Sequence, residues 1–177
     1  MSKGRSSVTF LGQLIAISAF FSSSIFGAEL ELGSAAEIDW RPAAAMSEEE
    51  RKKLPYFCQG SYIQPILTPL APDIASAEAD AAYYKDGVSL QLSGAVEVTQ
   101  GTQTIQSPRI NHNVLTEIAE IDGPLQIREP GLLMTGEHAT TNLFDGTGVI
   151  DQSTFLFHQS GLRGSSAIAE KDARGYI

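Results

Sequence analysis

The chain is poor in cysteine: Cys58 is the single one among 177 residues, so no disulfide can form within it. In an oxidising compartment, a lone cysteine points to pairing with another molecule or with residues beyond the chain. The alternative is a buried and inert thiol. That interpretation fits poorly with the loop-like stretch from Tyr56 to Tyr62, in which glycine and polar residues surround Cys58.

Basic residues are also scarce. The chain has 12 lysines and arginines against 21 aspartates and glutamates, which gives a formal charge of -9. Sequence-independent binding of nucleic acid requires a footprint of lysine and arginine on the phosphates. The composition therefore argues against that class of function, and an anionic ligand would have to be held through its apolar part. The 16 glycines and 8 prolines are typical of a turn-rich β protein with one modest core.

Long apolar runs are absent except for residues 8–21, which follow Lys3 and Arg5. A basic start followed by an apolar segment is typical of a secretory signal peptide, so residues 1–28 are predicted to be one, with cleavage near Ala28. An uncleaved anchor is the alternative, but this run of about 14 residues is shorter than the roughly 20 that span a bilayer. No later segment is apolar and long enough to span a membrane as a helix. The sequence therefore predicts an exported, soluble domain.

Closely spaced metal ligands are another absence. A zinc site usually contains ligand pairs roughly two to four residues apart, and no such pair occurs in the sequence. Three histidines have acidic residues near them in the chain: His112, His138 and His158, with Glu117, Glu120 and Glu137. His112 and His138 are expected at surface positions of strands or turns. The stretch 145–148, Asp-Gly-Thr-Gly, is similar to a calcium-binding glycine repeat but occurs once, and an ordinary turn explains it. The sequence thus predicts no catalytic residue, no metal site and no cofactor, and therefore not an enzyme.

Residues 29–73 are predicted to form an extended arm that includes Cys58 and one short helix. Ser47 and Glu50 have the spacing of a capping box, in which each side chain bonds the backbone N–H of the other. A helix from about Ser47 to Leu54, ended by Pro55, is expected. Four aromatic residues occur along the arm: Trp40, Tyr56, Phe57 and Tyr62. They are predicted to bury aromatic area and hold the arm on the domain, with stacking on a ligand as the alternative.

Residues 74–177 alternate apolar and polar side chains, which is typical of β-strands. The first strand is expected over residues 74–82, followed by a hairpin turn at Lys85-Asp86-Gly87. Another turn is expected at Glu129-Pro130-Gly131, where proline presets one turn dihedral and glycine accepts a positive φ.

The alternating pattern recurs after 29 positions. Equivalent pairs are Gly94 and Gly123, Val96 and Leu125, Val98 and Ile127, and Asn113 and Asn142. Such a repeat predicts stacked β-turn-β units, each too small to bury its own face. Breaks between strands are expected at Asp122-Gly123, Pro130-Gly131, Asp145-Gly146 and Ser160-Gly161. Roughly eight to ten short strands at such spacing predict an all-β sandwich, jelly roll or roll.

Residues two apart in a strand point to the same face of the sheet. The alternation predicts one inward-facing apolar set: Val96, Val98, Ile105, Leu125, Ile127, Leu143, Ile150, Phe155 and Phe157. A sheet that folds over and closes buries such a set as core, which is the usual role of an apolar stripe. A sheet that stays open presents an apolar slot to a long, thin ligand. The sequence leaves both outcomes open.

Five stretches carry a resemblance to a known family. They are Ile38-Asp39-Trp40, Cys58 to Pro65, Gly123 to Gly136, Ala139 to Asn142, and Arg163-Gly164. In this order they resemble the N-terminal part of the LptD family of lipopolysaccharide-assembly proteins, also called organic solvent tolerance proteins. The Arg-Glu-Pro-Gly stretch 128–131 and the Cys-x-Gly-x-Tyr segment 58–62 are the most specific parts. The resemblance covers essentially the whole chain after residue 28.

The resemblance implies an OstA/LptA-like β-jellyroll, or β-taco, of stacked antiparallel strands, in the periplasm next to the outer membrane of a Gram-negative bacterium. In that family the domain docks edge to edge with the bridge protein LptA, and lipid A acyl chains of lipopolysaccharide travel along the common slot. It precedes an outer-membrane barrel plugged by the lipoprotein LptE. Because this chain ends at Ile177, before any barrel, the resemblance implies a fragment or a truncated product that lacks the LptE contact.

Cys58 matches the first cysteine of the family by its surrounding motif. The resemblance implies that Cys58 forms a disulfide with a cysteine outside this chain.

The expected function is lipopolysaccharide transport and outer-membrane assembly: the jellyroll receives lipopolysaccharide from LptA and passes its acyl chains towards the barrel. The nine inward residues are the predicted lipid contacts, chosen by alternation. One alternative is a secreted structural or adhesive β-solenoid with a closed core. Another is a stand-alone LptA-like bridge protein, against which the arm with Trp40 and Cys58 argues.

Overall fold

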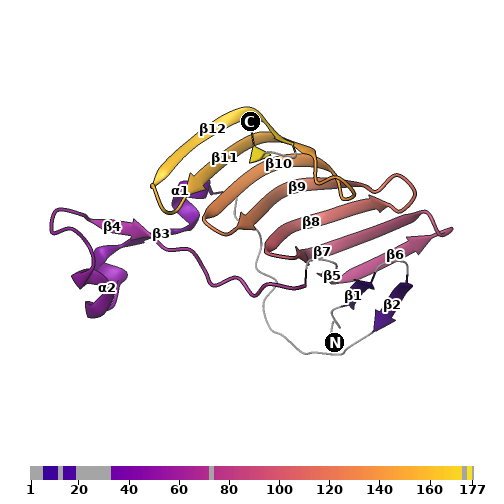
Figure 1. The fold of residues 1–177 in the computed structure, drawn as a ribbon, viewed down its shortest axis with the longest axis horizontal. Coiled ribbons are helices and arrows are strands. Elements are labelled where there is room, and N and C mark those ends of the chain that lie inside the picture. Colours follow the sequence, from indigo (N-terminus) through magenta and orange to yellow (C-terminus); the bar gives the residue numbers. More distant parts are fainter. Residues whose placement is uncertain (1–5, 12–13, 19–32, 72–73, 173–174, 177) are drawn as a thin grey trace.

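The computed structural model describes residues 6–11, 14–18, 33–71, 74–172 and 175–176 (Figure 1). One antiparallel sheet dominates it. Its strands are β1 (Ser6–Leu11), β2 (Leu14–Ser18), β5 (Ile74–Ala79), β6 (Ala81–Lys85), β7 (Ser89–Gln100), β8 (Gln103–Asn113), β9 (Ile118–Glu129), β10 (Leu132–Asn142), β11 (Gly148–Phe157), β12 (Leu162–Asp172) and β13 (Gly175–Tyr176). The order is β13-β12-β11-β10-β9-β8-β7-β5-β1-β2, with β6 also paired to β7. Along the described residues this path does not return to its start, so the sheet is open. The predicted all-β fold of stacked antiparallel strands is confirmed.

The 29-residue repeat is present in the strand boundaries. β7 and β8 begin at Ser89 and Gln103, and β9 and β10 begin 29 positions later, at Ile118 and Leu132. Each unit is a hairpin, and neighbouring units pair through the β8–β9 and β10–β11 ladders. The repeat therefore builds one continuous sheet rather than separate sheets.

The predicted break at Asp122-Gly123 is wrong, because β9, a strand of 12 residues, runs through both of these positions. Gly123 instead has a φ of 89° inside the strand, and the register between β8 and β9 shifts there, between Gln106 and Arg109. A positive φ is costly for residues with a Cβ, which explains glycine at this bulge. The strands are consequently longer than the sequence pattern suggested.

Positions with a positive φ align across the sheet. Gly94, Gly123 and Gln152, which are 29 residues apart, have φ values of 74°, 89° and 51°. Register shifts accompany Gly94 in the β7–β8 ladder and Gly123 in the β8–β9 and β9–β10 ladders, whereas the pairs on either side of Gln152 keep one register. A bulge bends its strand and increases its local twist. The aligned bulges at Gly94 and Gly123, in the middle of long strands, thus help to fold the sheet over.

The predicted turns and first strand have the expected conformations. Asp86 and Gly87 have φ values of 52° and 71°, as a type I′ hairpin requires. Gly131 has a φ of 83° in the β9–β10 turn. The strand predicted over residues 74–82 is present, but it bends at Asp80, so β5 pairs with one half of β7 and β6 with the other.

The inner face of the folded sheet buries one apolar cluster. Its buried members are Ala77, Ala79, Leu90, Leu92, Val96, Ile105, Ile110, Ala119, Ile121, Leu125, Ile127, Leu132, Met134, Ala139, Ile150 and Ala169. They come from β5 and from β7 to β12, with the bulges absorbing the change of alternation in mid-strand. The core is therefore shared by all three repeat units.

The arm consists of α1 (Ala35–Ile38), β3 (Trp40–Pro42), the 3₁₀ turn η1 (Ala43–Ala45), α2 (Glu48–Lys52) and β4 (Gly60–Tyr62). β3 and β4 pair only with each other among the described strands, and with α2 they project beyond one end of the sheet (Figure 1). The predicted helix is confirmed as α2, with Ser47 N–H donating to Glu50 Oε2 (2.8 Å) and Glu50 N–H donating to Ser47 Oγ (3.3 Å).

The sequence analysis missed α1. Ser34 and Glu37 have the same capping-box spacing as the residues that start α2, and Ser34 N–H donates to Glu37 Oε2 (2.9 Å). α1 lies against the outer face of β10 and β11, where Ala35 buries Leu133 and Leu156. The signal was available in the sequence, but a helix of one turn gives no apolar periodicity to support it.

A buried ion cluster attaches the arm to the sheet. Arg128 donates from both terminal nitrogens to the Asp39 carboxylate (2.7 and 2.9 Å), and His158 Nε2 lies 2.8 Å from Asp39 Oδ2. We call Asp39, Arg128 and His158 the arm anchor. The Asp39 side chain is 4% exposed, so these charges are sequestered from water. Gln64 adds two bonds to the β9–β10 turn, donating to the Glu129 carbonyl and accepting from the backbone N–H that follows Pro130.

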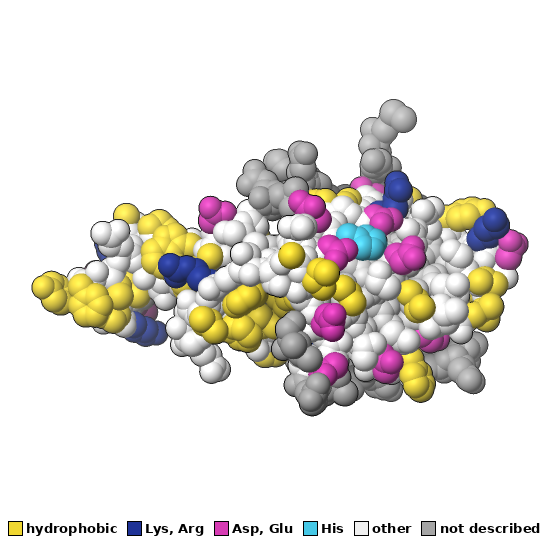
Figure 2. Space-filling view, turned by 90° about the horizontal axis from the view of Figure 1, so that it is seen from above, with side chains coloured by type: hydrophobic (Ala, Val, Ile, Leu, Met, Phe, Trp, Pro, Cys, Tyr) yellow, Lys and Arg dark blue, Asp and Glu magenta, His cyan; other side chains and the backbone are white. Residues whose placement is uncertain are grey.

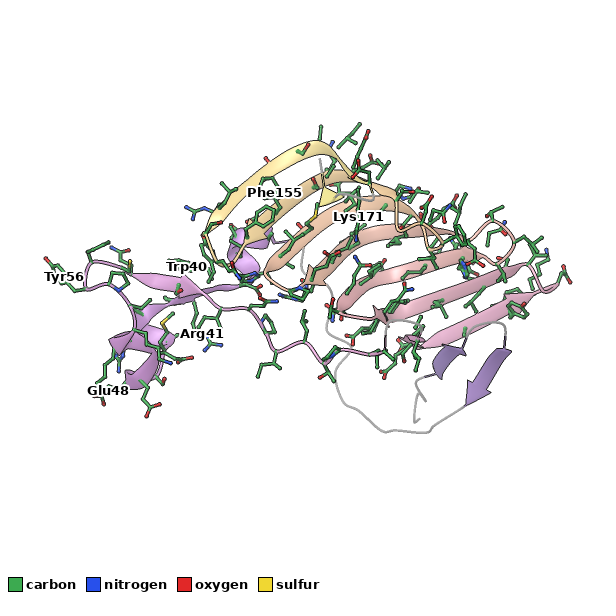
Figure 3. All side chains as sticks on the ribbon, in the orientation of Figure 1. Trp40, Arg41, Glu48, Tyr56, Phe155 and Lys171 are labelled. Atoms are coloured by element: carbon green, nitrogen blue, oxygen red, sulfur yellow. The ribbon has the colours of Figure 1, made fainter. Side chains whose placement is uncertain are left out.

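The predicted role of the arm aromatics is wrong for two of the four. Tyr56 and Phe57 are 100% and 77% exposed, and their rings contact each other. Figure 3 shows Tyr56 at the end of the arm. Tyr62 packs against the cluster under α1, and Trp40 packs edge-on against Tyr62 (5.1 Å between ring centroids). Polar anchoring rather than aromatic burial therefore holds most of the arm.

The predicted signal peptide, residues 1–28, lies largely outside the described residues. The described parts of it are β1 and β2, which extend the sheet beyond β5. Its removal and the cleavage position near Ala28 stay predictions.

Candidate functional site

A cavity of about 60 Å³ lies between two parts of the folded sheet. We call residues 100–105 and 127–129 the first rim, and residues 139–150 together with Lys171 the second rim. Isoleucines form the apolar part of the lining: Ile105, Ile121, Ile127 and Ile150. Amides, hydroxyls and one ammonium form the polar part: Gln100, Gln103, Thr140, Thr141, Asn142 and Lys171. The cavity therefore has an apolar interior with polar groups along its rims.

The two rims meet only because the sheet folds over. The strand register places Lys171 beside Gly148, Gly148 beside Thr141, and Thr141 beside Ala119. From Ala119 to Glu129 is ten positions of β9, about 33 Å in a flat sheet. Yet Lys171 Nζ lies 2.8 Å from Glu129 Oε1. The sheet must therefore fold over to bring these two residues together.

A polar connection closes the rims over the cavity. Lys171 on β12 donates to Glu129 Oε1 on β9, and Gln103 Nε2 on β8 donates to the same oxygen. We call Lys171, Glu129 and Gln103 the rim bridge. The Lys171 and Glu129 side chains are 28% and 25% exposed, so the bridge lies at the boundary between cavity and solvent. Figure 3 shows Lys171 and Phe155 inside the curve of β11 and β12.

The predicted inward residues do gather on the inner face, but in four different settings. Val96 and Leu125 are 1% exposed within the solid part of the core. Ile105, Ile127, Leu143 and Ile150 line the cavity. Val98, Leu143 and Phe155 are partly buried against the core cluster. Phe157 is 40% exposed at the end of β11 and contacts the Phe155 ring (5.9 Å between centroids). Their role as lipid contacts stays a prediction.

Alternation alone could not separate these settings. Gln100, Gln103 and Lys171 are polar residues near strand ends, and the sequence analysis did not select them for the cavity. Their contribution depends on the fold bringing strand ends of distant units together. A sequence signal for such a rim is absent, because polar residues are ordinary at the ends of strands.

Close packing limits the cavity. Gly136 lies where a Cβ would come within 2.5 Å of Ile150 Cγ2, and Gly164 lies under the Phe155 ring, where a Cβ would meet Phe155 Cζ at 2.7 Å. These glycines let β10, β11 and β12 approach their neighbours closely. A cavity of about 150 Å³ accepts a benzene-sized ligand, so the space between the rims is smaller than an acyl tail needs.

The histidines do not form a common site. His112 is mostly buried and faces Glu117 (3.4 Å), which corrects the predicted surface position. His138, which is more exposed, faces Asp122 (3.4 Å), and His158 belongs to the arm anchor. In the described part of the chain, no group of three or more His, Cys, Asp or Glu side chains could hold a metal ion.

The Asp-Gly-Thr-Gly stretch forms an ordinary turn between β10 and β11. The carboxylate of Asp145 accepts from the hydroxyl and the backbone N–H of Thr147 (2.7 and 2.9 Å). These two bonds, the hydroxyl first, lower the pKa of Asp145. The carboxylate of Asp145 thus finds its hydrogen-bond donors within the turn itself.

Cys58 carries a free thiol, half-buried, in the connection between α2 and β4. Its position at the end of the arm, next to exposed Tyr56 and Phe57, agrees with the predicted loop-like setting. Among the helices of the described residues, none has both the length and the apolar character to cross a membrane.

Comparison with curated proteins finds similarity to LPS-assembly proteins named LptD. The LPS-assembly protein LptD of Pseudomonas syringae pv. syringae (strain B728a) is 26% identical over 148 residues, which cover 79% of this chain and 16% of that protein. LptD of Hahella chejuensis (strain KCTC 2396) is 27% identical over 157 residues, covering 83% of this chain and 20% of that protein. The chain is homologous to the N-terminal region of LptD. It spans a fifth or less of the length of these curated relatives.

A solved structure also aligns with the chain. It is LptH, described as the LptA homologous periplasmic component of the lipopolysaccharide transport device from Pseudomonas aeruginosa, with a TM-score of 0.49 and 17% identity. The alignment covers 56% of this chain and 76% of that chain. No family model matches the sequence.

Proposed function

We propose that this chain is a module of lipopolysaccharide transport and outer-membrane assembly, which holds lipid A acyl chains between the two rims of its folded sheet. The observation that supports the proposal most directly is the apolar cavity between the rims, in a chain homologous to the N-terminal region of LptD. The cavity is partly open to solvent, between the two rims. We place the module in the periplasm, beside the outer membrane, as its homology suggests.

The physical chemistry suits transport rather than storage. Each buried methylene contributes about 0.8 kcal/mol of favourable transfer, without a directional bond that must break when the chain slides. The isoleucines on the inner face offer such contacts along successive strands. In this proposal an acyl tail enters when the rims separate, because the closed cavity is too small for it. The chain would act by holding and passing a ligand, not as an enzyme.

Docking of an LptA-type jellyroll at a sheet edge is part of the proposal. All residues of β6, Ala81 to Lys85, are exposed, and in the described structure β6 pairs with β7 alone. An exposed strand edge offers unpaired N–H and C=O groups to another strand.

Contact with LptE would require a barrel that these residues do not include. We likewise propose that Cys58 pairs with a cysteine outside the chain.

A photocrosslinking experiment tests the proposal. The amino acid p-benzoyl-phenylalanine replaces Leu143, at the second rim, or Ile168, which is 55% exposed on β12. Crosslinks to lipopolysaccharide are expected from position 143 and not from position 168. Adding Ile127→Asp should weaken crosslinking from position 143 about tenfold or more, because an ionised carboxylate opposes burial of acyl methylenes.

Ile168→Asp is the matched control, since it places the same charge on the outside of the sheet. Circular dichroism establishes that both aspartate variants remain folded. Equal crosslinking from positions 143 and 168, or an Ile127→Asp variant that is folded and crosslinks normally, would contradict a lipid site between the rims. Mass spectrometry of the purified chain adds a separate check, because a structural β-solenoid with a closed core would carry no bound lipid.

A further inference from the structure

The rim bridge crosses the opening through which a tail would have to enter. Lys171 belongs to the second rim, whereas Glu129 and Gln103 belong to the first. In sheet order β12 is three strands from β9, and the residues meet only by folding across the opening. Separation of the rims therefore requires the contact between Lys171 and Glu129 to break. That contact is the place where entry of a ligand can be controlled.

The charge distribution around the opening favours one chemical class of ligand head. Among the described residues that line the cavity, Lys171 is the one charged side chain; the others that are polar carry amides or hydroxyls. Amide N–H groups of Gln100, Gln103 and Asn142 lie on the same rims. Ammonium and amide donors around an apolar interior suit an amphiphile whose tail is apolar and whose head is an anion such as a phosphate.

We propose that Lys171 is the head-group contact of the cavity and that the rim bridge is its closed state. An anionic head group replaces the Glu129 carboxylate on Lys171, which separates the rims and admits the attached tail. The phosphate bears more negative charge than one carboxylate and offers three acceptor oxygens, so it competes well for an ammonium. This inference rests on the proposed function and adds to it the residue that selects the head group and the contact that controls opening.

The partial exposure of the bridge makes the exchange feasible. A fully buried ion pair is costly to separate, because each charge would be left without a partner in a medium of low dielectric. Side chains exposed by 28% and 25% can be reached by water and by a solvated head group while the bridge is still formed. In the arm anchor, by contrast, the Asp39 and His158 side chains are 4% and 7% exposed, and no such exchange is open to them.

Binding of two matched lipids tests the inference. The probes are 1-lauroyl lysophosphatidic acid and 1-lauroylglycerol, which share the tail and the glycerol and differ in the phosphate. Dissociation constants are measured below micelle formation, by displacement of an apolar fluorescent dye. The native chain is expected to bind the phosphate lipid about tenfold more tightly than the neutral one, as expected for a charge-assisted contact.

Each side of the bridge has its own expected effect. In Lys171→Met and Lys171→Gln the two lipids should bind with about equal affinity. Lys171→Arg should keep the preference for the phosphate lipid, because the charge remains. Glu129→Gln should tighten binding of the neutral lipid by about fivefold, because the rims separate at a lower cost. Lys85→Met, on exposed β6, is the control and should change neither lipid.

The outcomes separate this inference from the proposed function. If Ile127→Asp abolishes binding of both lipids while both neutral substitutions of Lys171 keep the phosphate preference, the tail site stands and the role of Lys171 is refuted. An unchanged affinity for the neutral lipid in Glu129→Gln would refute the bridge as the closing contact. If neither lipid binds the native chain or any variant, the proposed function fails and this inference fails with it.

Discussion

The sheet and the arm of this protein are stabilised in different ways. The sheet distributes its stabilisation over continuous backbone ladders from β7 to β12 and a buried cluster drawn from every repeat unit. The arm relies on a few specific contacts: the arm anchor, the two bonds of Gln64, and the small cluster under α1. Loss of one contact should therefore be tolerated in the sheet and not in the arm.

The surfaces of the two regions differ as well. The arm contributes Tyr56 and Phe57 as exposed aromatic rings, and hydrophobic side chains gather on it in the space-filling view (Figure 2). Over the sheet in the same view, acidic groups are scattered, with smaller hydrophobic patches between them. Figure 3 places Glu48 and Tyr56 far from Phe155 and Lys171. The difference teaches that the exposed end of the arm and the cavity of the sheet can be altered by separate substitutions.

The largest effect in this comparison is expected from the arm anchor. Asp39→Ala leaves Arg128 and His158 buried without a carboxylate, which should cost about 3–5 kcal/mol. Urea unfolding measures the loss, and limited proteolysis after Arg41 or Arg51 should show that the arm is released first.

Glu48→Ala is the control for the arm anchor, because it removes an ion pair with Lys52 whose side chains are 71% and 77% exposed. Exposed pairs contribute about 0–1 kcal/mol, so this variant should unfold close to the native chain. Equal losses in Asp39→Ala and Glu48→Ala would refute the view that buried polar contacts hold the arm.

An intermediate effect is expected where the sheet bends. Gly123 and Gly131 both have a positive φ, but a Cβ on Gly123 would come within 2.8 Å of Pro108 Cγ, whereas Gly131 has open space around it. Gly131→Ala should cost about 1–2 kcal/mol through backbone strain alone. Gly123→Ala should cost about 3 kcal/mol, because overpacking against Pro108 adds to the strain. Denaturant midpoints of the two variants measure the difference. Identical midpoints would show that the Pro108 ring moves aside without an energetic cost.

The smallest effect concerns pH and the α2 helix. Bonds from the Ser47 backbone N–H and hydroxyl lower the pKa of Glu50 below its ordinary value of 4.5. A lowered pKa means that this contribution is present above pH 4.5 and disappears as the pH falls through the folded value. Amide chemical shifts of α2 should therefore move as the pH falls through the folded pKa of Glu50. In Ser47→Ala the pKa of Glu50 should rise only part of the way towards its ordinary value, because the hydroxyl is lost while the backbone N–H of residue 47 can still donate. An unchanged titration of Glu50 would exclude the Ser47 hydroxyl as a cause.

The sequence predicted the local elements of this protein well. The Asp86-Gly87 hairpin, the Pro130-Gly131 turn and the α2 capping box follow from backbone preferences of the residues that form them. The apolar alternation selected residues that do face inward. It misjudged Gly123, because glycine after aspartate is equally compatible with a turn and with a bulge, and the choice depends on what pairs with it.

The candidate site was predictable only in part. Ile105, Ile127, Leu143 and Ile150 were selected by alternation and line the cavity. Leu125 and Val96 were selected by the same rule and lie in solid core, since alternation reports the face of a strand and not the space in front of it. Tyr56 and Phe57 were expected to be buried because of their size, but a ribbon that projects from the sheet has nothing to bury them against.

The sequence by itself determined the strands, their turns, the 29-residue repeat and the apolar face, because each depends on residues close together in the chain. Only the tertiary structure decided the arm anchor, which joins residues 89 and 119 positions apart, and the rim bridge, which joins residues 42 positions apart. Contacts at such separations depend on how aligned bulges bend a whole sheet. No single strand carries that information, because a bend acquires its direction from the neighbours against which the strand is paired.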